Sequence, residues 1–183
     1  MLQQTQVKTV IPYFNNFTRK FKTLNALSKS NEKEILKMWE GLGYYRRARN
    51  LLDCSKILVK NHKSRLPKSI KEIKKLPGVG DYTANALLGL VYNEPRIALD
   101  GNVKRVFSRI LNIKEKKIDF DKFIEKNKKQ LFITKRNDDF VEALMEFGAI
   151  TCKPKDPNCI TCCLNKSCKY LKSRKKIKNI RNK

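Results

Sequence analysis

Five of the six cysteines lie close together near the end of the sequence, in the stretch CKPKDPNCITCCLNKSC (residues 152–168). Four of them follow the spacing C-x6-C-x2-C-x5-C: Cys152, Cys159, Cys162 and Cys168. Cys163 is left out of this set, because two adjacent side chains cannot easily point at one centre. The spacing indicates that one short loop gathers four thiols around a common point, which is a strong constraint on the fold.

Disulfides do not suit these cysteines. No signal peptide is visible and Cys54 lies far from the rest, so a cytosolic metal site is the better interpretation. A zinc ribbon has two well-separated C-x2-C pairs and a Cys2His2 finger needs paired histidines, whereas His62 is the single histidine. Four thiolates in one loop suit a 4Fe-4S cluster. Zinc and unliganded thiols remain the alternatives.

The net charge is large: 42 Lys and Arg stand against 17 Asp and Glu, a formal charge of +25 over 183 residues. Scattered lysines in a chain rich in Lys, Asn and Ile can be ordinary solvated surface. A field of this sign also attracts a polyanion such as a phosphate backbone. No apolar run approaches the roughly 20 residues that cross a bilayer, so we expect a soluble protein with no membrane partner.

The apolar residues recur with the period of a helix almost everywhere, and no segment has the pattern of a strand. Three amphipathic helices are expected from the sets Val103, Val106, Phe107, Ile110 and Leu111; Phe140, Ala143, Leu144 and Phe147; and Ala48, Leu51, Leu52, Ser55 and Leu58. Asn31, followed three residues later by Glu34, is typical of a capped helix start. The fold class predicted from these patterns is all-α.

The segment KEIKKLPGVGDYTANALLGLV (residues 71–91) predicts two helices joined by a turn, with the second helix beginning at Asp81. Gly78 and Gly80 in the turn allow backbone conformations and close approaches that other residues do not. Successive amide groups at such a turn, with the N-terminus of the next helix, can bind a phosphate. The alternative is an ordinary connection between helices.

Together, LPGVGDYTA, LDGNVKRV and the cysteine spacing resemble the iron-sulfur helix-hairpin-helix DNA glycosylases, the superfamily of endonuclease III. In the endonuclease III branch a lysine nucleophile follows the hairpin glycines, but Tyr82 occupies that position here. The stretches MLQQTQVKTVIPYF, GLGYYRRARNL and LDGNVKRV are similar to the MutY-type adenine glycosylase branch, which removes adenine mispaired with 8-oxoguanine. This resemblance covers the sequence from Met1 to about Cys168.

The resemblance implies roles for individual residues. Asp100 would stabilise the positive sugar that forms as adenine departs, with Tyr82 and Asn102 orienting the site and the water; Asp100 is also well placed to cap a helix. Contacts with DNA are implied for the remaining positions: Leu2, Gln4, Tyr44, Leu76, Gly78, Gly80 and Lys104. Gln4 and Tyr44 would press into the base stack, while Leu2 packs beside the adenine. Independently of the resemblance, Lys104 and Arg105 follow Asp100 closely and could neutralise phosphates, although a solvated face explains them almost as well. The lysines of residues 153–157 would contact the DNA backbone.

The resemblance also implies what the given sequence does not contain. The family's proton donor is a glutamate two residues before the methionine that matches Met1, and its second domain would follow in place of the tail YLKSRKKIKNIRNK. We expect two helical lobes, residues 1–93 with the hairpin and residues 94–170 with the cluster, and a flexible basic tail over 171–183. Asp100 and Tyr82 would face a cleft from opposite lobes.

Three hypotheses for function follow. The first is a monomeric, cytoplasmic, nucleoid-associated adenine DNA glycosylase that acts on double-stranded DNA with mispaired adenine and whose true start lies upstream. The second is a non-catalytic remnant of such a glycosylase, which binds damaged DNA without cleaving it. The third is a basic nucleic-acid-binding module that is stabilised by zinc. Iron analysis separates the third from the other two.

Overall fold

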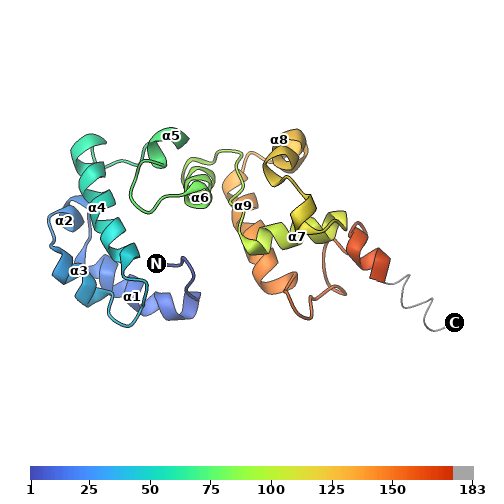
Figure 1. Ribbon diagram of the computed structural model, residues 1–183, viewed down its shortest axis with the longest axis horizontal. Helices are drawn as coiled ribbons and strands as arrows, with labels where there is room; N and C mark the ends of the chain where they lie inside the picture. Colours follow the sequence, from blue (N-terminus) through green and yellow to red (C-terminus); the bar gives the residue numbers. More distant parts are fainter. Residues whose placement is uncertain (175–183) are drawn as a thin grey trace. The chain divides into compact units, whose positions relative to one another are not determined.

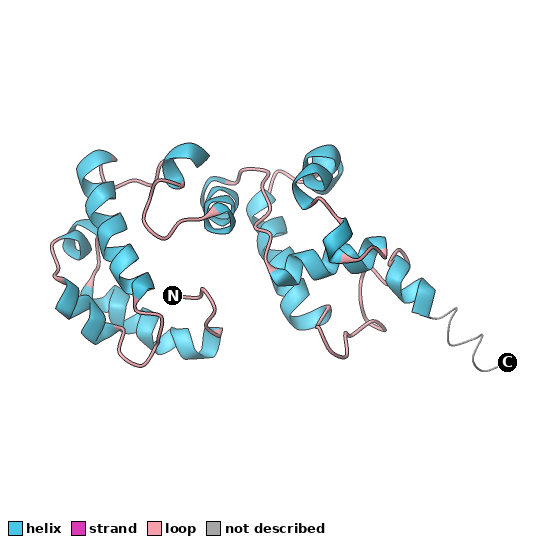
Figure 2. Cartoon of the chain, viewed as in Figure 1, coloured by secondary structure: helices cyan, strands magenta, loops and turns pink. Residues whose placement is uncertain are grey.

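The computed structural model describes residues 1–174, and within them every regular element is a helix and no strand occurs (Figures 1 and 2). The all-α prediction is therefore confirmed for this part of the chain. The chain forms two compact units, Met1–Gly80 and Asp81–Lys183. The helix that follows the LPGVG turn thus belongs with the second unit.

The first unit contains five helices among its described residues: α1 (Val7–Lys20), α2 (Leu24–Ser28), α3 (Glu32–Met38), α4 (Arg46–Asn61) and α5 (Ile70–Ile73). α4 packs on α2 and α3, and α1 packs on α3. The buried indole of Trp39 meets the Phe17 ring edge-on, with 6.4 Å between centroids, at the centre of this core. The predicted helix at α4 is confirmed, as is the cap of α3, where Asn31 Oδ1 accepts a 2.9 Å hydrogen bond from the Glu34 amide.

The second unit is built from α6 (Asp81–Tyr92), α7 (Gly101–Leu111), the 3-10 helix η1 (Glu115–Lys117), α8 (Phe120–Leu131), α9 (Asn137–Glu146) and the π-helix η2 (Phe147–Thr151). α6 packs on α9, and both α9 and η2 pack on α7. Two edge-on ring pairs, Phe107 with Phe123 and Phe132 with Phe140, fill the core around Val103. The helices predicted at α7 and α9 are confirmed, but α9 ends at Glu146, so Phe147 lies in the π-helix.

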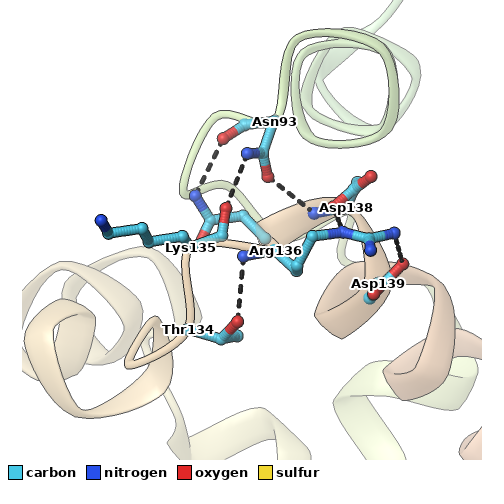
Figure 3. A network of polar contacts seen from close by, with 7 residues as sticks. Asn93, Thr134, Lys135, Arg136, Asp138 and Asp139 are labelled. Atoms are coloured by element: carbon cyan, nitrogen blue, oxygen red, sulfur yellow. Dashed lines mark hydrogen bonds and ion pairs between the residues drawn. The ribbon is translucent and has the colours of Figure 1, made fainter.

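The end of α6 is held to the start of α9 by the side chain of Asn93 (Figure 3). Its Nδ2 donates to the Lys135 carbonyl at 2.7 Å, and its Oδ1 accepts from the Asp138 amide at 3.1 Å. Arg136, at the N-cap of α9, makes no side-chain cap. Asn93 therefore caps α9 from a distance in sequence, and its φ of 55° is one that Asn tolerates better than most residues.

The C-terminal end of the described chain is a helical stretch at residues 169–174. The first residues of the segment for which the sequence favoured a flexible arm, 171–174, therefore belong to a helix, and 175–183 lie outside the described residues. The central guanidinium carbons of Arg109 and Arg174 lie 5.4 and 5.6 Å from the centre of the Tyr170 ring. No helix within residues 1–174 has both the length and the apolar character that a membrane span requires.

Candidate functional site

Asp100 is the N-cap of α7, and both of its carboxylate oxygens accept hydrogen bonds. Oδ1 accepts from the Val103 amide at 2.7 Å, and Oδ2 accepts from Asn102 Nδ2 at 3.2 Å. The carboxylate is half-buried at the positive end of a helix dipole, where negative charge is favoured. The sequence-based cap assignment is confirmed, and the geometry fixes the orientation of one negative group.

Tyr82 stands in the first turn of α6, with 37% of its surface exposed. Burial raises the pKa of Tyr82, and the charge of Asp100 raises it further, which places the phenol in the electrostatic reach of that carboxylate. We expected the two residues on opposite lobes, but both belong to the unit Asp81–Lys183. The reason is the packing of α6 on α9, where Gly89 lets Val141 approach its backbone closely.

Asn102 connects the carboxylate to Arg105 one helical turn further on. Arg105 Nη2 donates to Asn102 Oδ1 at 2.8 Å and to the Gly148 carbonyl at 2.7 Å, while its Nε donates to the Cys152 carbonyl at 2.9 Å. Nε and Nη2 of Arg105 are thus used inside the unit, and its contact with phosphate stays a prediction. A Cβ at Gly148 would lie 2.8 Å from Asn102 Cβ, so glycine is required for this approach.

The four spaced cysteines line one small cavity of about 30 Å³ between α7, η2 and the cysteine loop, whereas Cys163 is exposed. Its lining also contains apolar residues, Val106, Ile110, Phe147, Leu164 and Leu171, and polar ones, Arg109, Thr151, Asn158, Asn165 and Tyr170. Burial raises the pKa of Cys162, a backbone hydrogen bond with Leu164 acts against this rise, and the neighbouring cysteines add to it. Within residues 1–174 no group of three or more His, Cys, Asp or Glu side chains is arranged to hold a metal ion. Four thiols that face one apolar cavity nevertheless form a donor set suited to soft metal centres.

Arg109, on the same face of α7 as Arg105, organises the start of the cysteine loop. Nη1 donates to the carbonyls of Cys152 and Lys153, at 3.3 and 2.6 Å, and lies 3.4 Å from Cys152 Sγ. Nη2 donates to the Pro154 carbonyl at 2.9 Å. The sequence analysis did not identify Arg109. The one available signal was its spacing of four residues from Arg105, which places both side chains on the face of α7 that meets the loop.

The LPGVG turn departs from expectation in two respects. Its leading helix, α5, is only four residues long, and Leu76 is 3% exposed. The Leu76 side chain is therefore buried in the first unit, and the predicted contact of this residue with DNA stays a prediction. Gly78 has a φ of +76°, and a Cβ there would lie 2.6 Å from Asn50 Nδ2, whereas Gly80 has open space around it. The turn therefore requires glycine at 78.

The remaining predicted DNA contacts lie on exposed surface or beside it. Leu2 and Tyr44 are 58% and 63% exposed, and Gln4 is exposed as well. Gln4 and Tyr44 both have positive φ values, 57° and 51°. Lys104 is half-buried, with its ammonium 5.9 Å from the centre of the Phe120 ring.

These features define an all-helical protein with a glycine turn before one helix, an aspartate cap on the next and a loop of four cysteines, as in helix-hairpin-helix DNA glycosylases. The sequence profile of HhH-GPD superfamily base excision DNA repair proteins matches residues 1–130, and the chain belongs to this family. A thermostable thymine-DNA glycosylase superposes with a TM-score of 0.82, at 28% identity, over 94% of this chain and 80% of its own. Endonuclease III in a trapped covalent intermediate with DNA gives 0.76, at 26% identity, over 94% and 80%.

Curated relatives are named adenine DNA glycosylase. That of Buchnera aphidicola subsp. Baizongia pistaciae is 41% identical over 95% of this chain and 50% of its own length. The proteins of Schizosaccharomyces pombe and Homo sapiens are 37% and 34% identical, over 98% and 92% of this chain and 40% and 32% of theirs. The chain therefore spans half or less of the length of these relatives.

Proposed function

We propose that this chain carries the catalytic core of an adenine DNA glycosylase, which hydrolyses the N-glycosidic bond of adenine mispaired with 8-oxoguanine or guanine. The observation that carries the proposal is the Asp100 carboxylate, oriented by Val103 and Asn102 and close enough to Tyr82 to shift its pKa. Relatives named adenine DNA glycosylase, similar over nearly all of this chain, support the choice of base.

In this proposal Asp100 supplies the fixed negative charge. As adenine leaves, positive charge develops on the sugar, and an oriented carboxylate in a partly desolvated site stabilises it without having to reorganise. Asn102 keeps Oδ2 in place. The Tyr82 phenol, whose ordinary pKa of about 10 is raised further by burial and by the charge of Asp100, is a hydrogen-bond donor at neutral pH. Because Tyr82 offers no amine at the position of the lyase lysine, the sugar is not captured covalently and the strand is not cut.

The proposed partner is double-stranded DNA, bound by a monomer. Leu2, Gln4 and Tyr44 present exposed side chains that can enter the stack beside an extruded adenine. The Gly78 turn and the amides at the start of α6 serve a phosphate, and Lys104 adds positive charge. The net charge of +25 favours encounter with DNA at low salt.

The proposed cofactor is a 4Fe-4S cluster held by Cys152, Cys159, Cys162 and Cys168. These side chains fit such a group because all four line one apolar cavity. When bound, the cluster supplies four strong iron–thiolate bonds that shape the loop. Arg109 and Arg105 hold the carbonyls at the start of that loop, so residues 153–157 are presented to the DNA backbone in one conformation.

The test measures binding and base release separately. Fluorescence anisotropy with labelled duplexes should show tighter binding to adenine opposite 8-oxoguanine than to a matched duplex, with affinity falling steeply as salt rises. Release of adenine needs a proton donor, which the family resemblance places two residues before Met1. The chain is therefore extended at its N-terminus with a segment that carries a glutamate at that position, and single-turnover release is followed as alkali-labile strand breaks.

The expected result is adenine release from the mispair, with no strand break before alkali. Equal affinity for matched and mispaired duplexes, together with no release by the extended chain, would overturn the proposal. Strand breaks without alkali would show a lyase and would contradict the assignment of Tyr82.

A further inference from the structure

Arg47, in the first turn of α4, joins two segments that are distant in sequence. Its Nη1 donates to the carbonyls of Met1, at 2.6 Å, and of Gln3. Its Nη2 donates to the carbonyls of Gly43, at 3.2 Å, and Leu42, at 3.5 Å. All four terminal N–H groups of this guanidinium are therefore directed at backbone carbonyls, and the remaining donor, Nε, is buried without a hydrogen-bond partner.

Two aromatic side chains, Trp39 and Tyr44, contact the same guanidinium. Its central carbon lies 5.6 Å from the centre of the Trp39 ring and 5.4 Å from that of the Tyr44 ring. Trp39 is 1% exposed, and its Nε1 donates to the Gly43 carbonyl at 3.1 Å, which gives Arg47 a rigid support in the core. The fork geometry and the flat faces together explain why this position needs arginine rather than lysine.

Both segments that Arg47 holds contain a residue in the left-handed region of backbone space. Gln4 has a φ of 57° and follows the bonded carbonyl of Gln3, and Tyr44 has a φ of 51° and follows that of Gly43. Side chains with a Cβ avoid this region, and a bulky tyrosine does so most strongly. Such conformations persist only where neighbouring contacts impose them, and they concentrate at sites of function.

We propose that Arg47 is a positioning residue that braces Gln4 and Tyr44 against each other, so that both enter the DNA stack as one preformed wedge. The inference rests on the proposed function, since it assumes that these two side chains meet DNA. Arg47 itself does not contact DNA in this proposal. The free protein holds the wedge ready, and less ordering is left to accompany binding.

The first test needs no DNA. Hydrogen exchange is measured by mass spectrometry for peptides covering residues 1–9 and 39–45, in the wild type and in the Arg47→Lys and Arg47→Met variants. Both variants should speed exchange in the two peptides by about tenfold, because the shared anchor is lost. The matched controls are Arg49→Lys and Arg49→Met, on the same helix, where Arg49 makes an exposed ion pair with Glu32 (2.7 Å). The controls should leave both peptides unchanged.

A measurement on the wild type covers the case in which Arg47 variants do not fold. At low urea concentrations, hydrogen exchange should give the same free energy of local opening for the amides of both peptides, because a single guanidinium holds the two segments together. Separate openings of the two segments would overturn the bracing.

The second test measures stack entry with 2-aminopurine placed beside the mispaired adenine. Wild-type protein should raise its fluorescence on the mispaired duplex, and Arg47→Lys should weaken this response about tenfold in apparent affinity although the charge is kept. Arg49→Lys should respond as the wild type does. An unchanged response in Arg47→Lys would overturn the positioning role of Arg47. If the wild type gave no response, the proposed function would be refuted, and the hydrogen-exchange result would then decide whether Arg47 holds the two segments together.

Discussion

Asn102 donates a hydrogen bond from Nδ2 to Oδ2 of Asp100 at 3.2 Å, while the other oxygen of that carboxylate accepts from the Val103 amide at 2.7 Å. One oxygen of Asp100, Oδ1, thus caps α7, and Asn102 in the same helix orients the other oxygen, Oδ2. The two roles are separable, because asparagine caps a helix about as well as aspartate but carries no charge.

Asp100→Asn should therefore abolish adenine release and leave the fold intact. In the chain extended to carry the family's glutamate, we expect single-turnover release to fall by about a hundredfold or more, since fixed charge at the reacting centre is lost. The free energy of unfolding should change by less than about 0.5 kcal/mol. Affinity for the mispaired duplex should not fall.

The matched control for this variant is Asp119→Asn. Asp119 caps α8 through the Lys122 amide at 3.2 Å, so the substitution removes the same charge from a second helix N-cap in the same unit. Release should be unaffected. A similar loss of release in both variants would show that net charge, rather than the position of Asp100, is responsible.

The titration of Tyr82 reports its proximity to Asp100. Burial is the larger cause of its raised pKa and the Asp100 charge the smaller, so Asp100→Asn should lower that pKa while leaving it above the ordinary value. The folded state holds this proton more tightly than the unfolded state. The associated stability is therefore complete below the unfolded pKa of about 10 and is lost as pH rises through the folded pKa.

NMR of ring-labelled tyrosines measures this titration, with the Tyr82 signal assigned by its loss in Tyr82→Phe. Asp119→Asn should leave the Tyr82 titration unchanged. If Asp100→Asn also left it unchanged, the electrostatic contact between Tyr82 and Asp100 would be disproved.

The cysteine loop should contain iron. Protein purified without oxygen should be brown and contain about four irons per chain, and Cys159→Ser should lose iron and fold stability together. Cys163→Ser is the matched control, because Cys163 lies in the same loop but is exposed and does not line the cavity. Metal analysis that found stoichiometric zinc and no iron would contradict the prediction.

The two glycines of the LPGVG turn should differ in their tolerance of a side chain. Gly78→Ala should lower the free energy of unfolding by about 1–2 kcal/mol, since φ is +76° and the new Cβ would meet Asn50. Gly80→Ala should change it by less than about 0.5 kcal/mol, because that position is open. Urea unfolding measures both, and equal losses would argue against the geometry of the turn.

Asn93 should stabilise the second unit through its side chain. Asn93→Gly keeps the positive φ accessible but removes the bonds to Lys135 and Asp138, so we expect a loss of about 1–2 kcal/mol. The matched control is Asn112→Gly, at the C-cap of α7 with a φ of 56°, where glycine is the preferred residue. Thermal unfolding should separate the two variants; a control that loses as much as Asn93→Gly would assign the effect to backbone entropy.

Local features of this protein were predictable from the sequence. The helical period located α4, α7 and α9, and the spacing of Asn31 and Glu34 located a cap, because each of these structures depends on residues within one or two turns. The four cysteines could be grouped for the same reason, since their separation along the chain is short. Whether Leu76 faced solvent or core could not be read, because a leucine before a turn suits either.

Sequence alone thus determined the helical class, the capping aspartate, the glycine turn and the shared cysteine loop. Only the tertiary structure decided which arginines turn inward. Arg47 binds the carbonyls of Met1 and Gln3, Arg105 binds that of Cys152, and Arg109 binds that of Pro154. Each of these carbonyls lies 44 to 47 residues away from its arginine along the sequence. These carbonyls have no partner within a helix, and a guanidinium can donate to them only after folding has brought the segments together. Neither the periodicity of the sequence nor the spacing of its motifs could therefore predict the contacts.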